Sequence, residues 1–165
     1  MLNIDLSIIA PCYNEEHNIP EFVNRLIKTV KKIGLRAEII LINDGSTDNT
    51  ENIIHSLVNL HHGVVFGLNN KKNLGIEESW RNGLEECSGR NVCIIDSDLQ
   101  YQPEAIERLY RELQYSNADV VQGYRSSIGR LEDSRKILSQ CFSKDISKAQ
   151  SHTIHFGTIS GNDGT

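Results

Sequence analysis

Short apolar runs alternate along the chain with longer segments in which apolar residues recur every three or four positions. The short runs predict buried strands, and the longer spacing predicts amphipathic helices. Strands are predicted at residues 6–11, 37–43, 64–68, 92–95 and 118–123. The helices between them are predicted from apolar faces that contain Ile19, Phe22, Val23, Leu26, Ile27, Val30 and Ile33, then Ile53, Ile54, Leu57 and Leu60, then Ile76, Trp80, Leu84 and Cys87, and finally Ile106, Leu109, Tyr110 and Leu113.

Several polar residues, with one proline and one glycine, mark the ends of these helices. Asn18, with Glu21 three residues later, predicts a capping box, and Gly34 ends the first helix. Ser46, Thr47 or Asp48 can cap the second helix. Gly83 interrupts the third, and Pro103 opens the fourth. Strands that alternate with helices, and that are buried on both faces, predict an α/β fold with a mostly parallel, Rossmann-like sheet and helices on both of its faces.

Three polar clusters directly follow predicted strands, at residues 13–15, 44–46 and 96–100. In open parallel sheets, ligands bind beyond the carboxyl ends of the strands, near a reversal of strand order. We therefore expect the three clusters to share one rim of the sheet. The sequence has neither Gly-x-Gly-x-x-Gly nor a Walker motif, which argues against a dinucleotide site and a P-loop.

The third cluster is Asp96-Ser-Asp98-Leu-Gln100, directly after an apolar strand. If the backbone stays extended there, side chains two residues apart point the same way, so Asp96, Asp98 and Gln100 would share a face. Three oxygen ligands on one face suit magnesium or manganese. The alternative is an ordinary loop or helix cap, which an isolated Asp-x-Asp more often is.

Composition narrows the function classes further. A chain of 165 residues with 38% hydrophobic and 24% charged residues predicts one soluble domain, and a net charge of −5 with scattered Lys and Arg argues against nucleic-acid binding. The four cysteines show no metal-ligand or paired spacing and are expected to be reduced. No signal peptide is expected, and no apolar run approaches the roughly 20 residues of a membrane span. We expect a cytoplasmic protein, with any membrane contact peripheral.

The end of the chain differs in composition from the rest. Residues 144–165 are rich in Ser, Thr, Gly, His and Asp with only isolated apolar residues, so we expect one domain over residues 1–143 and a poorly ordered polar tail over 144–165. His152 and His155 could form a metal-binding pair. A solvated tail explains them better, because no other ligand cluster accompanies them.

Five motifs, in order, resemble the family 2 glycosyltransferases of the GT-A fold. They are Ser7 to Glu16, Glu38 to Asp48, Asn73-Leu-Gly with Gly83, Asp96 to Gln100 with Pro103-Glu104, and Asp119 to Arg125 followed by Arg135 to Ser139. The resemblance runs from Ser7 to about Phe142 and is closest to the dolichyl-phosphate or polyprenyl-phosphate hexose transferases. Asn43 stands where an aspartate is usual, which we treat as a minor departure.

The resemblance implies a nucleoside site beside a cation site. The residues that would hold the nucleoside of a GDP- or UDP-hexose are Pro11, Tyr13, Glu15 and Asp44. Asp96 would contact the ribose or the metal, and Asp98 and Gln100 would bind Mn²⁺ or Mg²⁺. Three of these residues also have a purely structural explanation: Tyr13 could be an aromatic residue at the edge of the sheet, Glu15 an acid in the first turn that the helix dipole favours, and Asp44 a turn and cap residue.

The implied reaction is a metal-dependent, inverting transfer of the hexose to a polyprenyl phosphate. A phosphate monoester is already anionic at neutral pH, since its second pKa is about 6, so it needs cationic positioning more than a base. Arg125 and Arg135 suit that task, although ordinary surface arginine is the competing interpretation. The expected catalytic residues are Asp96, Asp98 and Arg125.

The rest of the family pattern is not recognisable after residue 143, so we expect a nucleotide-binding half with a truncated or unrelated end. Such a sheet could expose an edge that a second copy or a partner subunit covers. Two alternatives to polyprenyl-phosphate transfer follow. One is a non-catalytic module that binds a nucleotide or a partner, and the other is a family 2 transferase that acts on a saccharide hydroxyl.

Overall fold

The computed structural model describes residues 3–116, 118–123 and 152–156, and its core is a parallel sheet with strand order β3-β2-β1-β4-β6-β5. The strands are β1 (Leu6–Cys12), β2 (Ala37–Asn43), β3 (Val65–Asn69), β4 (Asn91–Ile94), β5 (Val120–Gly123) and β6 (His152–Phe156). The helices are α1 (Ile19–Lys32), α2 (Thr50–Leu60), α3 (Ile76–Glu86) and α4 (Ala105–Tyr115). The predicted α/β architecture is confirmed, and each predicted element has a counterpart.

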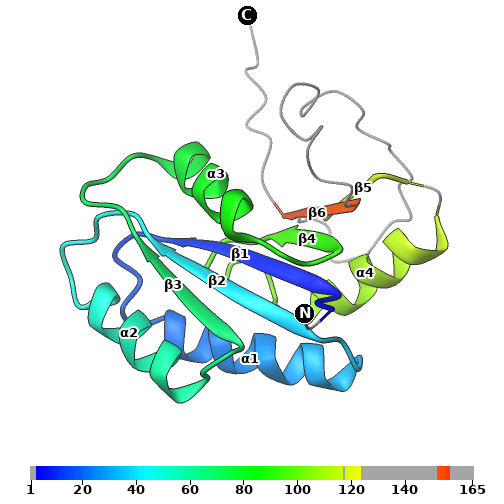
Figure 1. The fold of residues 1–165 in the computed structure, drawn as a ribbon, viewed down its shortest axis with the longest axis horizontal. Helices are drawn as coiled ribbons and strands as arrows, with labels where there is room; N and C mark the ends of the chain where they lie inside the picture. The colour runs from blue at the N-terminus through cyan, green and yellow to red at the C-terminus, as the bar shows by residue number, and fades with distance from the viewer. Residues whose placement is uncertain (1–2, 117, 124–151, 157–165) are drawn as a thin grey trace, which may run out of the picture.

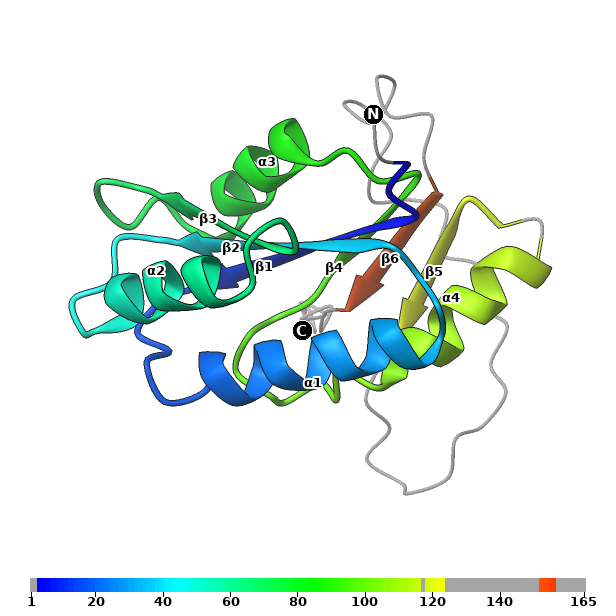
Figure 2. The same cartoon turned by 60° about the horizontal axis from the view of Figure 1, so that its bottom comes forward.

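Helices cover both faces of the sheet, as predicted. In Figures 1 and 2, α1, α2 and α4 lie on one face and α3 lies on the other. The larger hydrophobic cluster joins alternate residues of β1 and β2, such as Ile8 and Ile39, to buried side chains of α1 such as Phe22. The smaller one joins the intervening residues, such as Ile9, to Trp80 on α3. Burial on both faces explains why β1 and β2 are almost continuously apolar.

Gly83 lies inside α3 and does not interrupt it, contrary to the prediction. A Cβ atom at this position would be 2.5 Å from Cγ2 of Ile9 on β1 and 3.2 Å from Cδ1 of Ile42 on β2. The glycine therefore lets α3 approach the sheet more closely than any larger residue would allow. Its helix-weakening effect is offset by that packing.

The helix ends agree only partly with the prediction. Gly34 has φ of 73° and its N–H donates to Lys31 O, as expected for a glycine that ends a helix. The capping box at Asn18 is not formed: its side chain caps no helix N–H, and its Nδ2 donates to Glu15 Oε2 at 2.7 Å. At α2, Asp48 Oδ1 accepts from the N–H of Thr50 at 3.0 Å, so Asp48 is the residue that holds this end.

Two predictions of burial were wrong at the β3 side of the sheet. Leu60 was placed on the inward face of α2, but it is 73% exposed at the last residue of that helix. Strand β3 was expected to be buried on both faces, but its pattern is mostly exposed and Phe66 is 43% exposed. In the described part of the chain β3 pairs with β2 alone, so it forms an edge where one face is only partly covered.

Strand β6 differs from the expectation of little packed structure over residues 144–165. Its backbone pairs in parallel with β4 on one side and with β5 on the other. Isolated apolar residues gave no strand signal there, because pairing with two neighbouring strands depends on long-range contacts. The predicted domain boundary at residue 143, and the expectation that a partner covers a sheet edge, stay predictions.

Strand order reverses between β1 and β4, which places a crevice between them. The chain leaves β1 for β2 and β3 on one side, then returns to β4 on the other side of β1. Loops that leave β1 and β4 in opposite directions open such a crevice at the carboxyl edge, where α/β proteins bind ligands. The first and third polar clusters of the sequence follow these two strands.

The opposite, amino edge of the sheet holds a buried carboxylate that is fully occupied. Glu38 on β2 is 7% exposed, and its Oε1 accepts from Ser7 Oγ at 2.5 Å and from Ser88 N at 2.6 Å. Gly89 N in turn donates to Ser7 Oγ at 2.8 Å. These bonds fasten the loop before β4 to the sheet. We therefore assign Glu38 to the architecture and not to a ligand site.

No helix in the described segments is long and apolar enough to cross a membrane. The longest of those named above, α1, has 14 residues, and its outer face carries lysine and glutamate. A bilayer span needs roughly 20 predominantly apolar residues.

Candidate functional site

The loops after β1 and β2 are joined to each other by hydrogen bonds. Asn14 N donates to Ser46 Oγ at 3.0 Å, and Asn14 Oδ1 accepts from Thr47 N at 2.8 Å. Glu16 N donates to Asp48 Oδ2 at 3.2 Å. Asn14 adopts the left-handed backbone conformation, with φ of 56°, which asparagine tolerates better than most residues. The first two polar clusters therefore form one connected rim.

Asp44 links this rim to the loop between β3 and α3. Its Oδ1 accepts from Asn70 Nδ2 at 2.8 Å and from Leu74 N at 2.9 Å, and its Oδ2 accepts from Gly75 N at 2.9 Å. The residue is buried, with 4% exposure. Both carboxylate oxygens thus hold residues 70–75. Asp44 therefore does more than form a local turn or cap a helix, which was the structural alternative. That Asp44 also contacts a nucleobase stays a prediction.

The environment of Asp44 favours its charged form. Burial by itself raises the pKa of this carboxyl, but hydrogen bonds from Leu74, Asn70, Gly75 and Ser79 outweigh burial and hold the pKa below its ordinary value. The loop is therefore fastened by charge-assisted hydrogen bonds, which are stronger than neutral ones.

Replacement of Asp44 by asparagine should destabilise the protein in a pH-dependent way. An amide accepts through one oxygen only, so one of the N–H groups of the loop loses its partner, at a cost of about 1–3 kcal/mol. Because the folded pKa is lowered, the carboxylate stabilises the fold above the unfolded pKa of roughly 3.9, and this stabilisation is lost as the pH falls through the folded pKa. Urea unfolding from pH 7 to pH 3 should show the difference between wild type and Asp44→Asn shrinking below about pH 4.

A matched control is Glu85→Gln, which removes the same formal charge from the exposed face of α3. We expect this variant to follow the wild-type pH dependence. An Asp44→Asn variant that loses equal stability at every pH would contradict the assignment of a lowered pKa.

Three polar residues around Asp44 were not singled out by sequence analysis. Asn70 Nδ2 also lies 3.2 Å from Ser79 Oγ, and Asn82 Nδ2 donates to Asn70 Oδ1 at 2.9 Å. They come from a loop and from two turns of α3, and no local spacing connects them to Asp44. Only their packing on the end of β2 shows that they form one network.

Asn43 performs a task that an aspartate would perform equally well. Its Oδ1 accepts from Ser46 N at 3.1 Å, within the turn that follows β2. The residue is 3% exposed, so its side chain faces this turn and not the solvent. An aspartate oxygen could accept the same bond, which agrees with treating Asn43 as a minor departure.

Carboxylates from two loops gather at the crevice between β1 and β4. Ser97 Oγ donates to Pro11 O at 2.8 Å and so ties the loop after β4 to the end of β1. Burial raises the pKa of the Asp96 carboxyl, and the nearby negative charges of Asp98 and Glu15 raise it further. Mutual repulsion among these three acids is what a bound cation would relieve, and carboxylate oxygens are the ligands that Mg²⁺ and Mn²⁺ prefer.

The geometric argument for Gln100 was wrong. The chain does not stay extended after β4: it turns at Ser97 and Asp98, and Leu99 has φ of 61°. Asp98 Oδ1 accepts from Gln100 N at 2.9 Å, which closes a short turn, and Gln100 is exposed. Alternation along a strand therefore does not place Asp96, Asp98 and Gln100 on one face. The role of Gln100 as a ligand rests on the resemblance alone.

Leu99 and Asn14 share an unusual feature. Within the residues that the structure describes, they are the non-glycine residues with positive φ, and each lies in a loop at the crevice. For leucine this conformation is costly, and such strain concentrates at functional sites. The same described residues contain no group of three or more His, Cys, Asp or Glu already arranged around one metal position.

The remaining predicted residues divide into three groups. Tyr13 is 47% exposed in the loop after β1, so its ring is accessible to a ligand. Pro11 and Glu15 lie beside it and are partly buried. Arg125 and Arg135, predicted to bind the acceptor phosphate, lie outside the described residues. The histidine pair, His152 and His155, falls on β6, where only the backbone is described.

The arrangement of the sheet and its helices is that of the GT-A glycosyltransferases. The mannosyltransferase PcManGT from Pyrobaculum calidifontis, solved with GDP-Man and Mn²⁺, superposes with a TM-score of 0.62 and 17% identity, over 76% of this chain and 37% of that one. Glucosyl-3-phosphoglycerate synthase from Mycobacterium tuberculosis, solved with Mn²⁺, UDP and phosphoglyceric acid, gives a TM-score of 0.59 and 25% identity, over 75% of this chain and 44% of that one.

The family model of glycosyl transferase family 2 matches residues 7–161, and the chain belongs to this family. A protein from Shewanella sediminis (strain HAW-EB3), named undecaprenyl-phosphate 4-deoxy-4-formamido-L-arabinose transferase, is 34% identical over 126 residues. The match covers 74% of this chain and 38% of that relative, so the chain spans little more than a third of its length. The family predicted from the five motifs is confirmed.

Proposed function

We propose that this chain is the donor-binding part of a metal-dependent, inverting glycosyltransferase. The donor is a UDP- or GDP-sugar, and the acceptor of the sugar is a polyprenyl phosphate. The observation that carries the proposal is the acidic crevice at the switch point of the sheet, where the loop after β1 brings Glu15 and the loop after β4 brings Asp96 and Asp98, and where Ser97 Oγ donates to Pro11 O to join the two loops. The name of the relative from Shewanella sediminis supports a polyprenyl-phosphate acceptor.

In this proposal Asp96 and Asp98 hold Mn²⁺ or Mg²⁺, with Gln100 as a further ligand. Two solved neighbours contain Mn²⁺ together with a nucleotide or sugar nucleotide, which supports a shared donor chemistry. A bound cation supplies positive charge for the oxygens of the departing nucleoside diphosphate. Pro11, Tyr13, Glu15 and Asp44 are proposed to hold the nucleoside, with the exposed ring of Tyr13 as a stacking surface.

The reaction that follows is a substitution at the anomeric carbon. An anionic oxygen of the acceptor phosphate forms a bond to this carbon, and the bond to the nucleoside diphosphate breaks, with the electron pair leaving on the diphosphate. No general base is required, because the acceptor oxygen carries no proton at neutral pH. Arg125 and Arg135 are proposed to bind the acceptor phosphate, by the bidentate geometry that arginine offers to phosphate.

The sugar and the acceptor are separable parts of the proposal. The sugar named for the relative from Shewanella sediminis is a derivative of arabinose, a pentose, whereas the motifs resemble hexose transferases most closely. A panel of donors should therefore include UDP- and GDP-hexoses as well as a UDP-arabinose derivative. Contact with a membrane surface, where a polyprenyl phosphate resides, would be peripheral and cytoplasmic.

Calorimetric titration of the 165-residue chain with UDP and with GDP, each with MnCl₂ and with EDTA, tests donor binding. We expect one nucleotide to bind with manganese and to lose most of its affinity with EDTA. A transfer assay with a short-chain polyprenyl phosphate then tests the reaction by mass spectrometry of the lipid. Manganese-dependent binding without transfer would favour a non-catalytic module, and failure to bind either nucleotide would contradict the proposal.

A further inference from the structure

Arg25 on α1 reaches across to the loop that carries the candidate cation ligands. Its Nε donates to Glu104 Oε1 at 2.8 Å and its Nη2 donates to Glu104 Oε2 at 2.5 Å, so the guanidinium grips the carboxylate with two nitrogens. Nη2 also donates to Gln102 Oε1. One side chain therefore holds Glu104 and Gln102, which lie 79 and 77 positions later in the chain.

Arg25 is itself held on a rigid element. Helix α1 buries one broad face against the sheet through Ile19, Phe22, Val23, Leu26, Ile27, Thr29 and Val30. The Arg25 side chain is only 22% exposed, and the hydroxyl of Thr29 donates to Arg25 O at 2.9 Å. The bond to Glu104 raises the pKa of Arg25 and lowers that of the glutamate, so both partners are charged at neutral pH.

The gripped residues belong to the loop that begins at Asp96 and ends at α4. On its inner side, Leu99 and Tyr101 pack against the larger hydrophobic cluster, and Pro103 is buried. On its outer side, Gln102 and Glu104 are exposed and are fastened by Arg25. The strained turn lies at Leu99 itself, next to Asp98 and three residues before Gln102.

We propose that Arg25 is a positioning residue, which fastens residues 102–104 and thereby holds the turn at Asp98 in the conformation that presents its carboxylate to a cation. The inference rests on the proposed function for its metal and on the geometry alone for the loop. A strained turn persists only where its surroundings over-determine it, and Arg25 supplies the outer half of that restraint. The competing view is that this contact is an ordinary surface ion pair between α1 and α4.

The chain offers a matched control for that competing view. Lys32 Nζ lies 2.7 Å from Glu107 Oε2, so this pair joins the same two helices without touching residues 96–104. Exposed ion pairs of this kind contribute little to stability, because solvent screens both charges. Arg25→Met and Lys32→Met should therefore change the urea midpoint to a similar small extent, while only Arg25→Met should change the loop.

Two measurements separate the views. Hydrogen exchange on the free protein should show residues 98–104 exchanging at least about 10-fold faster in Arg25→Met than in Lys32→Met. The loop opens more easily in Arg25→Met because its bonds to Arg25 are gone, and a change of about 10-fold corresponds to RT ln 10 in the free energy of local opening. Titration with MnCl₂ in the presence of the preferred nucleotide should show about 10-fold weaker manganese binding in Arg25→Met only, the lower end of the range seen when a group that orients a metal ligand is removed. Arg25→Lys, which keeps the charge but not the fork, should recover part of both.

The outcomes are distinguishable from those of the proposed function. Equal exchange in the two methionine variants would overturn the positioning role, whatever the protein binds. Faster loop exchange with unchanged manganese affinity would also overturn it, because the loop would then be held without consequence for the cation. If the wild type binds no manganese, the proposed function fails and so does the metal part of this inference, while the exchange data still decide the contact with the loop.

Discussion

Asp98→Asn should abolish the manganese dependence of nucleotide binding. The asparagine keeps the size of the side chain and an oxygen that can accept the bond from Gln100 N, so the turn is preserved. What is lost is one of the three negative charges that Glu15, Asp96 and Asp98 bring to the crevice. Groups that only orient a metal ligand cost about 10–100-fold in affinity when removed, so loss of a ligand should cost at least about 100-fold.

The sign of the metal-free effect makes this prediction sharper. Without manganese, the carboxylates repel a nucleoside diphosphate, so Asp98→Asn should bind UDP or GDP in EDTA at least as tightly as the wild type does. Calorimetry in both conditions measures the two effects on one sample. Asp5→Asn, which makes the same substitution just before β1 at the amino edge of the sheet, serves as the control. A variant that keeps manganese-dependent affinity would refute Asp98 as a ligand.

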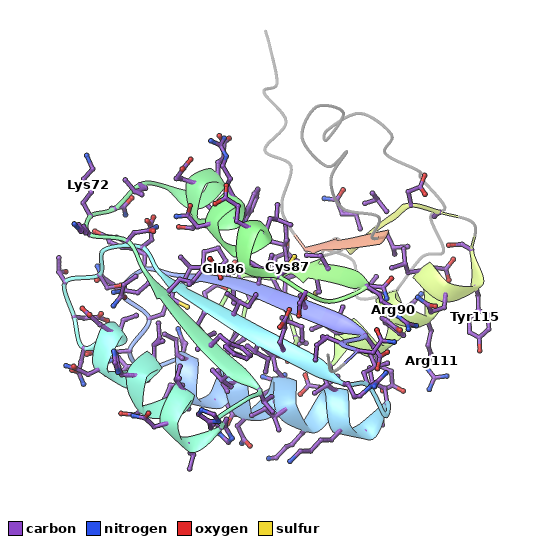
Figure 3. All side chains as sticks on the ribbon, viewed as in Figure 1. Lys72, Glu86, Cys87, Arg90, Arg111 and Tyr115 are labelled. Atoms are coloured by element: carbon purple, nitrogen blue, oxygen red, sulfur yellow. The ribbon has the colours of Figure 1, made fainter. Side chains whose placement is uncertain are left out.

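Gly45→Ala should be far more damaging than an ordinary glycine-to-alanine change. Gly45 has φ of 67°, and a Cβ atom there would be 2.3 Å from the backbone C atom of Lys72 and 2.4 Å from the backbone N atom of Asn73. Figure 3 shows Lys72 at the outer tip of this loop. Because backbone atoms cannot rotate aside as a side chain can, residues 70–75 must move away from the end of β2.

The expected result combines two costs. The left-handed conformation costs an alanine about 1–2 kcal/mol, and displacement of the loop breaks hydrogen bonds to Asp44 worth about 1–3 kcal/mol for each buried group left without a partner. We therefore expect a loss of about 2–5 kcal/mol in the free energy of unfolding by urea, together with weaker nucleotide binding. The measurement is the urea midpoint of each variant, with calorimetry on those that remain folded.

Gly63→Ala is the matched control for this substitution. Gly63 also has a left-handed backbone, with φ of 79°, but a Cβ atom there would meet nothing within 4 Å. It should therefore show the conformational cost alone, about 1–2 kcal/mol, with nucleotide binding unchanged. Equal losses in the two variants would mean that the β3–α3 loop is not pressed against Gly45.

Local sequence patterns predicted most of the fold. Almost continuous apolar residues along β1 and β2 can be buried only between two layers, so helices on both faces followed from the chain itself. The misplaced positions lie where burial depends on neighbours that the pattern does not contain. Leu60 fits the apolar spacing of α2, yet it is the last residue of that helix and is 73% exposed. Strand β6 has only a weak apolar pattern, so the sequence did not predict it. Its place in the sheet comes from backbone pairing with β4 and β5.

The site was predicted less completely than the fold. The structure places Asp44, Asp96 and Asp98 shortly after the carboxyl ends of β2 and β4, at the edge where such sheets bind ligands, and their roles as ligands stay predictions. Extension of the strand pattern to Gln100 failed, because the chain turns at Ser97. No motif indicated Arg25, which lies on the outer side of α1 and meets its partners only after the helix and the loop have packed.

By itself, the order of apolar and polar residues determined that this chain is a parallel α/β sheet with an acidic rim, since periodicity and strand ends are properties of neighbouring residues. The tertiary structure alone decided which groups hold that rim together. Asp44 accepts hydrogen bonds from a loop 26 to 31 residues away. The loop that carries Asp96 and Asp98 is held by Arg25, on a helix more than 70 residues earlier. Such contacts leave no repeating pattern in the sequence, because they depend on how elements that are distant along the chain pack together.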